Sequence, residues 1–131
     1  MKVGLLLLAS CSYDAGSFHS LTSTFPGERV TVGCLDLALD RPHEPEAQGP
    51  VVHYSFGNRC DHPVTVDFQS LVVRARNRAI TPFDPNHEIA PKTLETRAFG
   101  SEEIEYTALP GDQLCIDVGS LIAEPTRWVC V

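Results

Sequence analysis

The stretch Val51-Val52-His53-Tyr54-Ser55-Phe56 alternates apolar and polar side chains from Val52 onward. Successive side chains of a β-strand point to opposite faces of the sheet. The apolar residues Val52, Tyr54 and Phe56 therefore share one face, and the two polar residues between them share the other. This pattern predicts a strand with one face in the core.

The same alternation recurs along the chain. Val64, Val66 and Phe68 are spaced for one face, and so are Leu114, Ile116 and Val118. Short alternating runs between glycines and prolines are typical of an all-β sandwich or barrel. The strands expected on this basis cover residues 29–39, 51–56, 64–68, 71–75, 93–99, 102–107, 113–118 and 127–131.

Two proline-rich segments, residues 41–50 and 82–91, interrupt these runs and are expected to be loops. Within residues 29–39 the apolar positions change from even to odd at Gly33-Cys34. We expect a β-bulge there, because a bulge shifts the alternation by one residue and often contains glycine.

Length, composition and net charge limit the class of protein. The chain has 131 residues, which suits one domain, and 43% of them are hydrophobic, which is enough for a core. Its formal net charge of −7 argues against nucleic acid, whose binders need a concentrated basic surface, and against electrostatic docking on anionic lipid.

The N-terminus has the features of an export signal. Lys2 precedes an apolar run, and small residues lead into a cysteine. The run is far shorter than the roughly 20 residues of a transmembrane helix. The stretch Leu8-Ala9-Ser10-Cys11 resembles the lipobox of bacterial lipoproteins. This resemblance implies cleavage before Cys11 and acylation of its thiol and amino group, and two or more acyl chains give stable anchoring.

The resemblance also divides the chain. Residues 1–10 are expected to be a lipoprotein signal peptide, residues 11–24 a flexible polar tether, and residues 25–131 the folded domain. The residue after the cysteine is Ser12 and not an aspartate. In proteobacterial lipoproteins, which this N-terminus resembles, this favours sorting to the outer membrane. The expected location is therefore the cell envelope, at the periplasmic face of the outer membrane.

Once Cys11 is assigned to the lipid, four cysteines remain. An oxidising compartment favours two disulfides, and four cysteines allow three connectivities. Antiparallel pairing of the last two strands around Ile122 would place Cys115 opposite Cys130, at a separation that a disulfide can span. That leaves Cys34 with Cys60. A redox site is disfavoured because the sequence has no CxxC pair.

Arg74, Arg76 and Arg78 are the residues that most suggest binding. At a spacing of two, they are expected to project from one face of a single strand as a basic stripe on an acidic protein. The stripe would suit an anionic glycan or protein partner. The alternative is a structural ladder with Glu103 and Glu105, which share a face of another strand.

No other motif indicates chemistry. The histidines His19, His43, His53, His62 and His87 lack metal-binding spacing, and the sequence contains neither a GxSxG elbow nor a glycine-rich phosphate loop. We therefore predict no catalytic residue, no metal site and no cofactor.

One segment is similar to small bacterial extracytoplasmic domains of immunoglobulin-like fold. It runs Val52-x-Tyr54-x-Phe56-x-Asn58-x-Cys60-x-x-Pro63-Val64-x-Val66, with a later polar strand at residues 101–107. The resemblance implies an immunoglobulin-like antiparallel β-sandwich of about seven to eight strands. Domains of this kind bind or scaffold, and no catalytic residue carries over.

These observations predict a non-enzymatic, lipid-anchored domain that binds or scaffolds an envelope protein or glycan. One alternative is an inhibitor or accessory subunit of an envelope enzyme, with residues 81–91 as its reactive segment. Another is a small hydrolase, which would need a deep pocket uniting His53 or His62 with a carboxylate.

Overall fold

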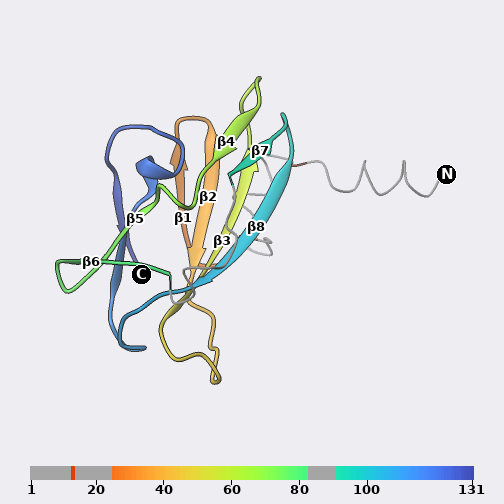
Figure 1. Ribbon diagram of the computed structural model, residues 1–131. Coiled ribbons are helices and arrows are strands. Elements are labelled where there is room, and N and C mark those ends of the chain that lie inside the picture. The colour runs from red at the N-terminus through yellow and green to blue at the C-terminus, as the bar shows by residue number, and fades with distance from the viewer. Residues whose placement is uncertain (1–12, 14–24, 83–90) are drawn as a thin grey trace, which may run out of the picture.

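The stretch that alternates from Val52 onward forms an inner strand of an antiparallel sheet. The computed structural model describes residue 13, residues 25–82 and residues 91–131. In it, β3 (Val51–Asn58) pairs with β2 (Leu35–Asp40) on one side and with β8 (Phe99–Glu105) on the other. Adding β1 (Glu28–Val32) next to β2 gives a first sheet of order β1-β2-β3-β8 (Figure 1).

A second four-stranded antiparallel sheet forms the other layer. Its order is β10 (Trp128–Cys130), β9 (Leu114–Asp117), β5 (Val72–Ala75) and β6 (Arg78–Ile80). The short strands β4 (Val64–Val66) and β7 (Lys92–Leu94) pair separately, beside the first sheet (Figure 1). A single 3-10 turn, η2 (Val118–Leu121), lies between β9 and β10.

The core lies between the two four-stranded sheets. Leu37, Tyr54 and Phe56 of the first sheet belong to the same buried cluster as Leu114 and Ile116 of the second. All five are at most 1% exposed. The predicted fold class is confirmed: the chain is an all-β sandwich of antiparallel strands. The inward residues that the alternation predicted are in the core, except Val64, which is half-buried outside the cluster.

The expected bulge at Gly33-Cys34 is wrong, because the chain reverses there. Val32 pairs with Leu35 across a two-residue loop, and Gly33 takes a φ of 59°. A positive φ at the first loop residue suits glycine and gives the twist that a tight hairpin requires. A two-residue loop changes the parity of the inward positions, as a bulge does, so the sequence pattern fits both.

The strand count is also higher than expected. The described residues contain ten strands where eight were expected, because predicted strand 29–39 is divided into β1 and β2 and because β6 was not predicted. Predicted strand 93–99 is interrupted after β7, and its last residue, Phe99, begins β8. Arg97 has a φ of 66° within that interruption, and Ala98 N donates to Glu95 O at 3.0 Å.

Both predicted disulfides are confirmed. Cys115 and Cys130 are direct partners in the β9–β10 register and are bonded to each other. Cys34, in the β1–β2 turn, is bonded to Cys60, just after β3. Each bond joins neighbouring segments of one sheet, so neither connects the two layers.

Residues 41–50 form the expected loop, which is held at both ends. Arg41 donates to the carbonyl oxygens of Pro110, Asp112 and Val131 at 2.9–3.1 Å. Glu105 Oε2 accepts from the backbone amides of Gln48 and Gly49 at 2.8 and 2.9 Å. Most of the second expected loop, residues 83–90, lies outside the described residues, and with it most of the suggested reactive segment.

Most of the expected signal peptide and tether also lies outside the described residues, but Tyr13 does not. It is 5% exposed and packs with Phe25 and Ala38 on the outer face of the first sheet. Tyr13 therefore belongs to the folded domain. Among the described residues, no helix is long and apolar enough to cross a membrane.

Candidate functional site

The three arginines lie on a β-hairpin and not on one strand. Arg74 is in β5, Arg78 is in β6, and Arg76 and Asn77 form the two-residue turn between them. Both turn residues have positive φ, at 54° and 64°. Paired positive φ values define the turn type that suits the twist of a hairpin, and asparagine tolerates them. Neither position is a glycine, so this turn has no strong signal in the sequence.

This reversal removes the expected stripe. Arg74 pairs with Ala79, and Arg78 pairs with Ala75. Directly paired residues share a face and neighbours along a strand do not, so Arg74 and Arg78 project from opposite faces of the hairpin. The prediction of a single basic face is therefore wrong.

The expected ladder with Glu103 and Glu105 is wrong as well, because β8 belongs to the other sheet. Glu103 Oε2 lies 3.3 Å from His53 Nδ1 on the outer face of the first sheet. Glu105 binds the backbone amides of residues 48 and 49, as described above. Neither glutamate meets an arginine of the hairpin.

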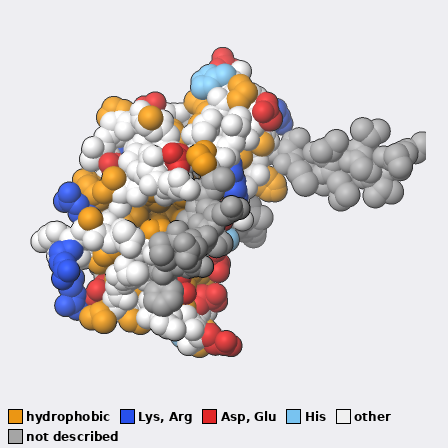
Figure 2. Space-filling model, in the orientation of Figure 1, with side chains coloured by type: hydrophobic (Ala, Val, Ile, Leu, Met, Phe, Trp, Pro, Cys, Tyr) orange, Lys and Arg blue, Asp and Glu red, His pale blue; other side chains and the backbone are white. Residues whose placement is uncertain are grey.

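Each arginine instead has its own environment. Arg76 Nε donates to Asp112 Oδ1 at 2.9 Å, and the Arg74 guanidinium lies 5.2 Å from the centre of the Trp128 ring. The Arg78 side chain is exposed and forms no hydrogen bond or ion pair with any residue that the structure describes. In Figure 2, Lys and Arg side chains gather at the left edge, over the position of β6 in Figure 1.

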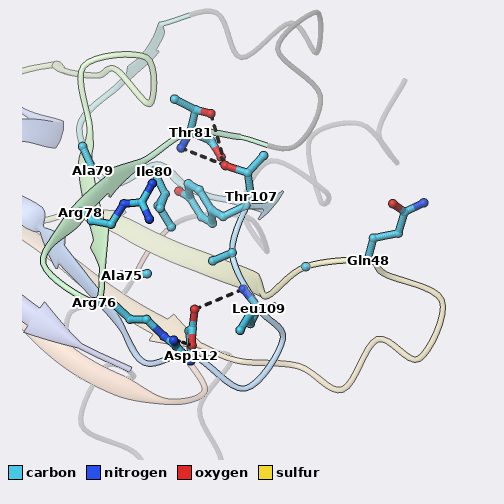
Figure 3. A pocket seen from close by; sticks show the side chains of 13 residues that line it. Gln48, Ala75, Arg76, Arg78, Ala79, Ile80, Thr81, Thr107, Leu109 and Asp112 are labelled. Carbon is cyan, nitrogen blue, oxygen red and sulfur yellow. Dashed lines mark hydrogen bonds and ion pairs between the residues drawn. The ribbon is translucent and has the colours of Figure 1, made fainter.

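Arg78 borders an open groove of about 550 Å³, which we call the hairpin groove. It lies where β6 meets the end of β8, and its lining includes Gln48, Arg76, Ile80, Thr81, Tyr106 and Leu109. Figure 3 shows the Arg78 side chain extending alongside Ile80 toward the interior of the groove. Leu109, on the rim, is 58% exposed.

The walls of the hairpin groove are fixed by hydrogen bonds. Thr107 N and Thr107 Oγ1 both donate to Thr81 O, at 2.9 and 3.1 Å, which joins the chain after β6 to the chain after β8. Asp112 accepts from Arg76 and from Leu109 N, and Arg41 binds the Asp112 carbonyl. Because Arg76 already binds Asp112, Arg78 is the cation of the described groove lining that remains available to bind a ligand.

A second hollow lies on the other side of the hairpin. It measures about 560 Å³, and we call it the tryptophan hollow. Arg74 and Trp128 line it, with Trp128 42% exposed, and Arg76 and Asp112 border both hollows. A guanidinium over an indole ring is an attractive contact that leaves its N–H groups free to bind an anion.

Tyr106 forms the buried side of the hairpin groove. Its hydroxyl lies 2.6 Å from that of Tyr54, deep in the core. Burial raises the pKa of both phenols well above the usual range, and the neighbouring Tyr106 raises the pKa of Tyr54 further. Both groups therefore stay neutral, and this pair supports the groove without titrating near neutral pH.

Among the residues that the structure describes, no histidine forms a catalytic pocket with a carboxylate. His53 and Glu103 meet on the surface, with side chains 29% and 48% exposed. His62 Nδ1 lies 3.0 Å from Pro63 O, and His62 lines a separate open hollow of about 460 Å³. His43 is exposed in the loop, and His19 and His87 lie outside the described residues.

One cluster of potential metal ligands was missed by spacing arguments. The sulfurs of Cys34 and Cys60 and a ring nitrogen of His62 lie within 4.8 Å of one another. The two sulfurs are bonded to each other, and a disulfide lacks the thiolates that a metal ion would bind. This cluster is therefore a structural disulfide with a histidine beside it.

Sequence reasoning found the arginines but missed the residues that give them a setting. Tyr106, Thr107, Asp112 and Trp128 are distant from the arginines along the chain, and neither they nor Thr81, three residues after Arg78, carry a motif. The sole tryptophan of the chain, Trp128, was the one available signal.

The fold and the hairpin together define a disulfide-bonded, two-layer β-domain with an arginine-bearing groove at one corner. No known family model matches the chain, and no curated protein matches it in sequence. The fold is similar to that of the yjhA protein from Bacillus subtilis, with a TM-score of 0.59 over 80% of this chain and 95% of that one. The two sequences are 11% identical, so the likeness concerns the fold alone.

Proposed function

We propose that this protein is a lipid-anchored, non-enzymatic binding domain of the bacterial cell envelope. Its β5–β6 hairpin would bind an acidic segment of another envelope protein. The lipid on Cys11 would keep the domain at the membrane, and the hairpin would select the partner.

The observation that carries the proposal is Arg78, which no described residue neutralises, in a groove whose other charged side chains, Arg76 and Asp112, bind each other. A guanidinium offers several donors in a fixed planar fork, which matches a carboxylate. The groove walls are held by Arg41, Glu105 and Asp112, so little conformational entropy would be lost on binding.

The character of the surroundings favours a protein over a glycan. Trp128 and Leu109 are exposed on either side of the hairpin, at 42% and 58%. Protein interfaces are enriched in tryptophan and arginine, which supply most of the binding energy. A mixed apolar and cationic surface fits an acidic peptide that also carries apolar side chains.

The binding site can be tested with the full chain carrying Cys11→Ser, so that no membrane is required. We expect poly-glutamate to bind the parent protein and to bind an Arg78→Gln variant about tenfold more weakly, since a charge-assisted hydrogen bond is lost. Arg97→Gln is the matched control, because it removes the same charge at an exposed position outside the groove.

Two results of this titration would contradict the proposal. Equal weakening in both variants would show a general charge effect and no site. Binding of an acidic polysaccharide such as polygalacturonate, with no binding of poly-glutamate, would assign the hairpin to a glycan.

The anchor requires a separate experiment. Growth with a fatty-acid analogue should label the wild-type protein, and Cys11→Ala should abolish the label because the acceptor thiol is lost. Labelling that persists in Cys11→Ala would overturn the lipoprotein assignment and leave the binding site to be judged alone.

A further inference from the structure

The outer face of the first sheet holds Tyr13 firmly in place. The Tyr13 hydroxyl donates a hydrogen bond to Asp36 Oδ2, and Tyr13 N donates to Arg97 O. Its ring meets the ring of Phe25 edge-on, with centres 5.5 Å apart. Thr31 and Arg59 also bind Asp36, at 2.8–3.2 Å, so this buried carboxylate fixes Tyr13 to β1, β2 and the end of β3.

A glycine in β3 makes room for this ring. A Cβ atom at Gly57 would lie 2.5 Å from two carbons of the Tyr13 ring, so no larger residue fits beneath it. An aromatic ring over a strand glycine covers backbone that would otherwise be exposed. The seat for Tyr13 is therefore built from Gly57, Asp36 and Phe25, and we call this set the tyrosine seat.

Covalent geometry then limits the distance to the lipid. Tyr13 is two residues after Cys11, and two residues of extended chain span at most about 7 Å. A domain that begins at Tyr13 cannot move far from an acylated Cys11. Phe25, the next described residue in the sequence, is fourteen positions beyond Cys11 and would by itself allow about 46–50 Å.

The surface beside the tyrosine seat is suited to the interface of a bilayer. Phe99 pairs with Gly57 across β3 and β8, so it lies on the same outer face, and it is 43% exposed. Arg97 is exposed two residues earlier, with Glu95 exposed in the same turn. An aromatic side chain with a neighbouring arginine is typical of the membrane interface, where the ring meets acyl chains and the cation meets phosphates.

We propose that the tyrosine seat holds the folded domain close to the acylated Cys11, so that the domain lies directly against the bilayer. Phe99 and Arg97 would then be in contact with the lipid headgroups. This inference rests on the lipid anchor proposed above and adds an orientation to it. The start of β8 and the hairpin strand β6 lie on opposite sides of the molecule (Figure 1). The hairpin groove would thus be held away from the membrane, toward a partner.

The orientation can be measured by fluorescence, since Trp128 is the sole tryptophan and lies in β10, in the other sheet. The acylated protein is placed in vesicles of phosphatidylethanolamine and phosphatidylglycerol whose acyl chains carry bromine, which quenches nearby indoles. In a Phe99→Trp, Trp128→Phe variant, we expect the new tryptophan to lose most of its fluorescence. Trp128 of the wild-type protein should keep its fluorescence in the same vesicles.

A linker variant tests the role of the short chain. Inserting about ten Gly and Ser residues between Ser12 and Tyr13 leaves the tyrosine seat intact and lengthens the reach to about 40 Å. We expect this insertion to relieve the quenching at position 99 while the protein still sediments with vesicles.

The outcomes separate the two proposals. A protein that is acylated and sediments with vesicles, but shows equal quenching at both positions or none at position 99, overturns the orientation and leaves the anchor standing. Quenching that survives the linker insertion shows that the short chain is not its cause, which also overturns the inference. A protein without acyl groups by mass spectrometry overturns the anchor, and the orientation with it.

Discussion

At the scale of single residues, one buried amide connects three segments. Asn58 is fully buried at the end of β3, and its Nδ2 lies within 3.0–3.2 Å of the carbonyl oxygens of His62, Leu94 and Glu95. Its Oδ1 accepts from Cys60 N at 2.7 Å. Asn58 thus holds together the disulfide turn after β3 and the turn after β7, and its backbone continues the sheet.

We expect Asn58→Ala to lower the free energy of unfolding by about 3 kcal/mol, since several buried backbone groups lose their partner. Gln69→Ala is the control, because it removes an exposed amide and should change stability by less than about 0.5 kcal/mol. Urea denaturation measures both values. Equal effects of the two substitutions would contradict the role given to Asn58.

The buried pair Tyr54 and Tyr106 predicts a loss of stability in alkali. The folded protein raises the pKa of both phenols, so below pH 10 both states are protonated and stability is unaffected. Above about pH 10 the unfolded chain ionises first, and stability should fall by up to about 1.4 kcal/mol per pH unit for each tyrosine.

Denaturation between neutral pH and pH 11 measures this slope. Tyr106→Phe should make the slope shallower, because one of the two groups no longer titrates in the unfolded chain. An identical slope in the variant would show that the alkaline effect has another origin.

At the scale of elements, the β5–β6 turn shows how backbone conformation sets a binding surface. Positive φ at Arg76 and Asn77 allows the reversal that directs Arg74 and Arg78 to opposite faces. A residue with a branched Cβ is strained in this conformation, whereas glycine is not.

Asn77→Val is therefore expected to destabilise the domain by about 1–2 kcal/mol, while Asn77→Gly should be neutral or slightly stabilising. Thermal unfolding compares the two variants, which share a position and differ in their tolerance of positive φ. Similar melting temperatures for Val and Gly would contradict the observed turn.

At the scale of the whole molecule, two disulfides support a small domain. The bonded cysteines are 26 and 15 residues apart, and each bond should contribute about 3 kcal/mol by restricting the unfolded chain. Domains of this size have a total stability of about 5–15 kcal/mol. The disulfides therefore supply a large part of it.

Full reduction should lower the free energy of unfolding by about 6 kcal/mol. Circular dichroism during denaturation, with and without a strong dithiol, measures the difference, and mass spectrometry of the alkylated native protein counts the bonds. Free thiols at all four positions in the native protein would contradict the assigned pairs.

The sequence alone determined what depends on local order. Alternation at Val52, Tyr54, Phe56 and in β9 predicted the inward faces, and antiparallel pairing of the last two strands predicted the Cys115–Cys130 bond. These predictions succeeded because a strand has a fixed period of two, and neighbouring strands place nearby residues opposite each other.

Tertiary structure decided where the chain reverses and what then comes together. A parity change at Gly33 fits a bulge or a hairpin equally, because both turn Leu35 and Leu37 inward. The antiparallel pairing of β1 with β2 selects the hairpin. The setting of Arg78 depends on Tyr106 and Leu109, and the seat of Tyr13 depends on Gly57. Such contacts join residues far apart in the chain, and only the closure of the two sheets brings them within reach.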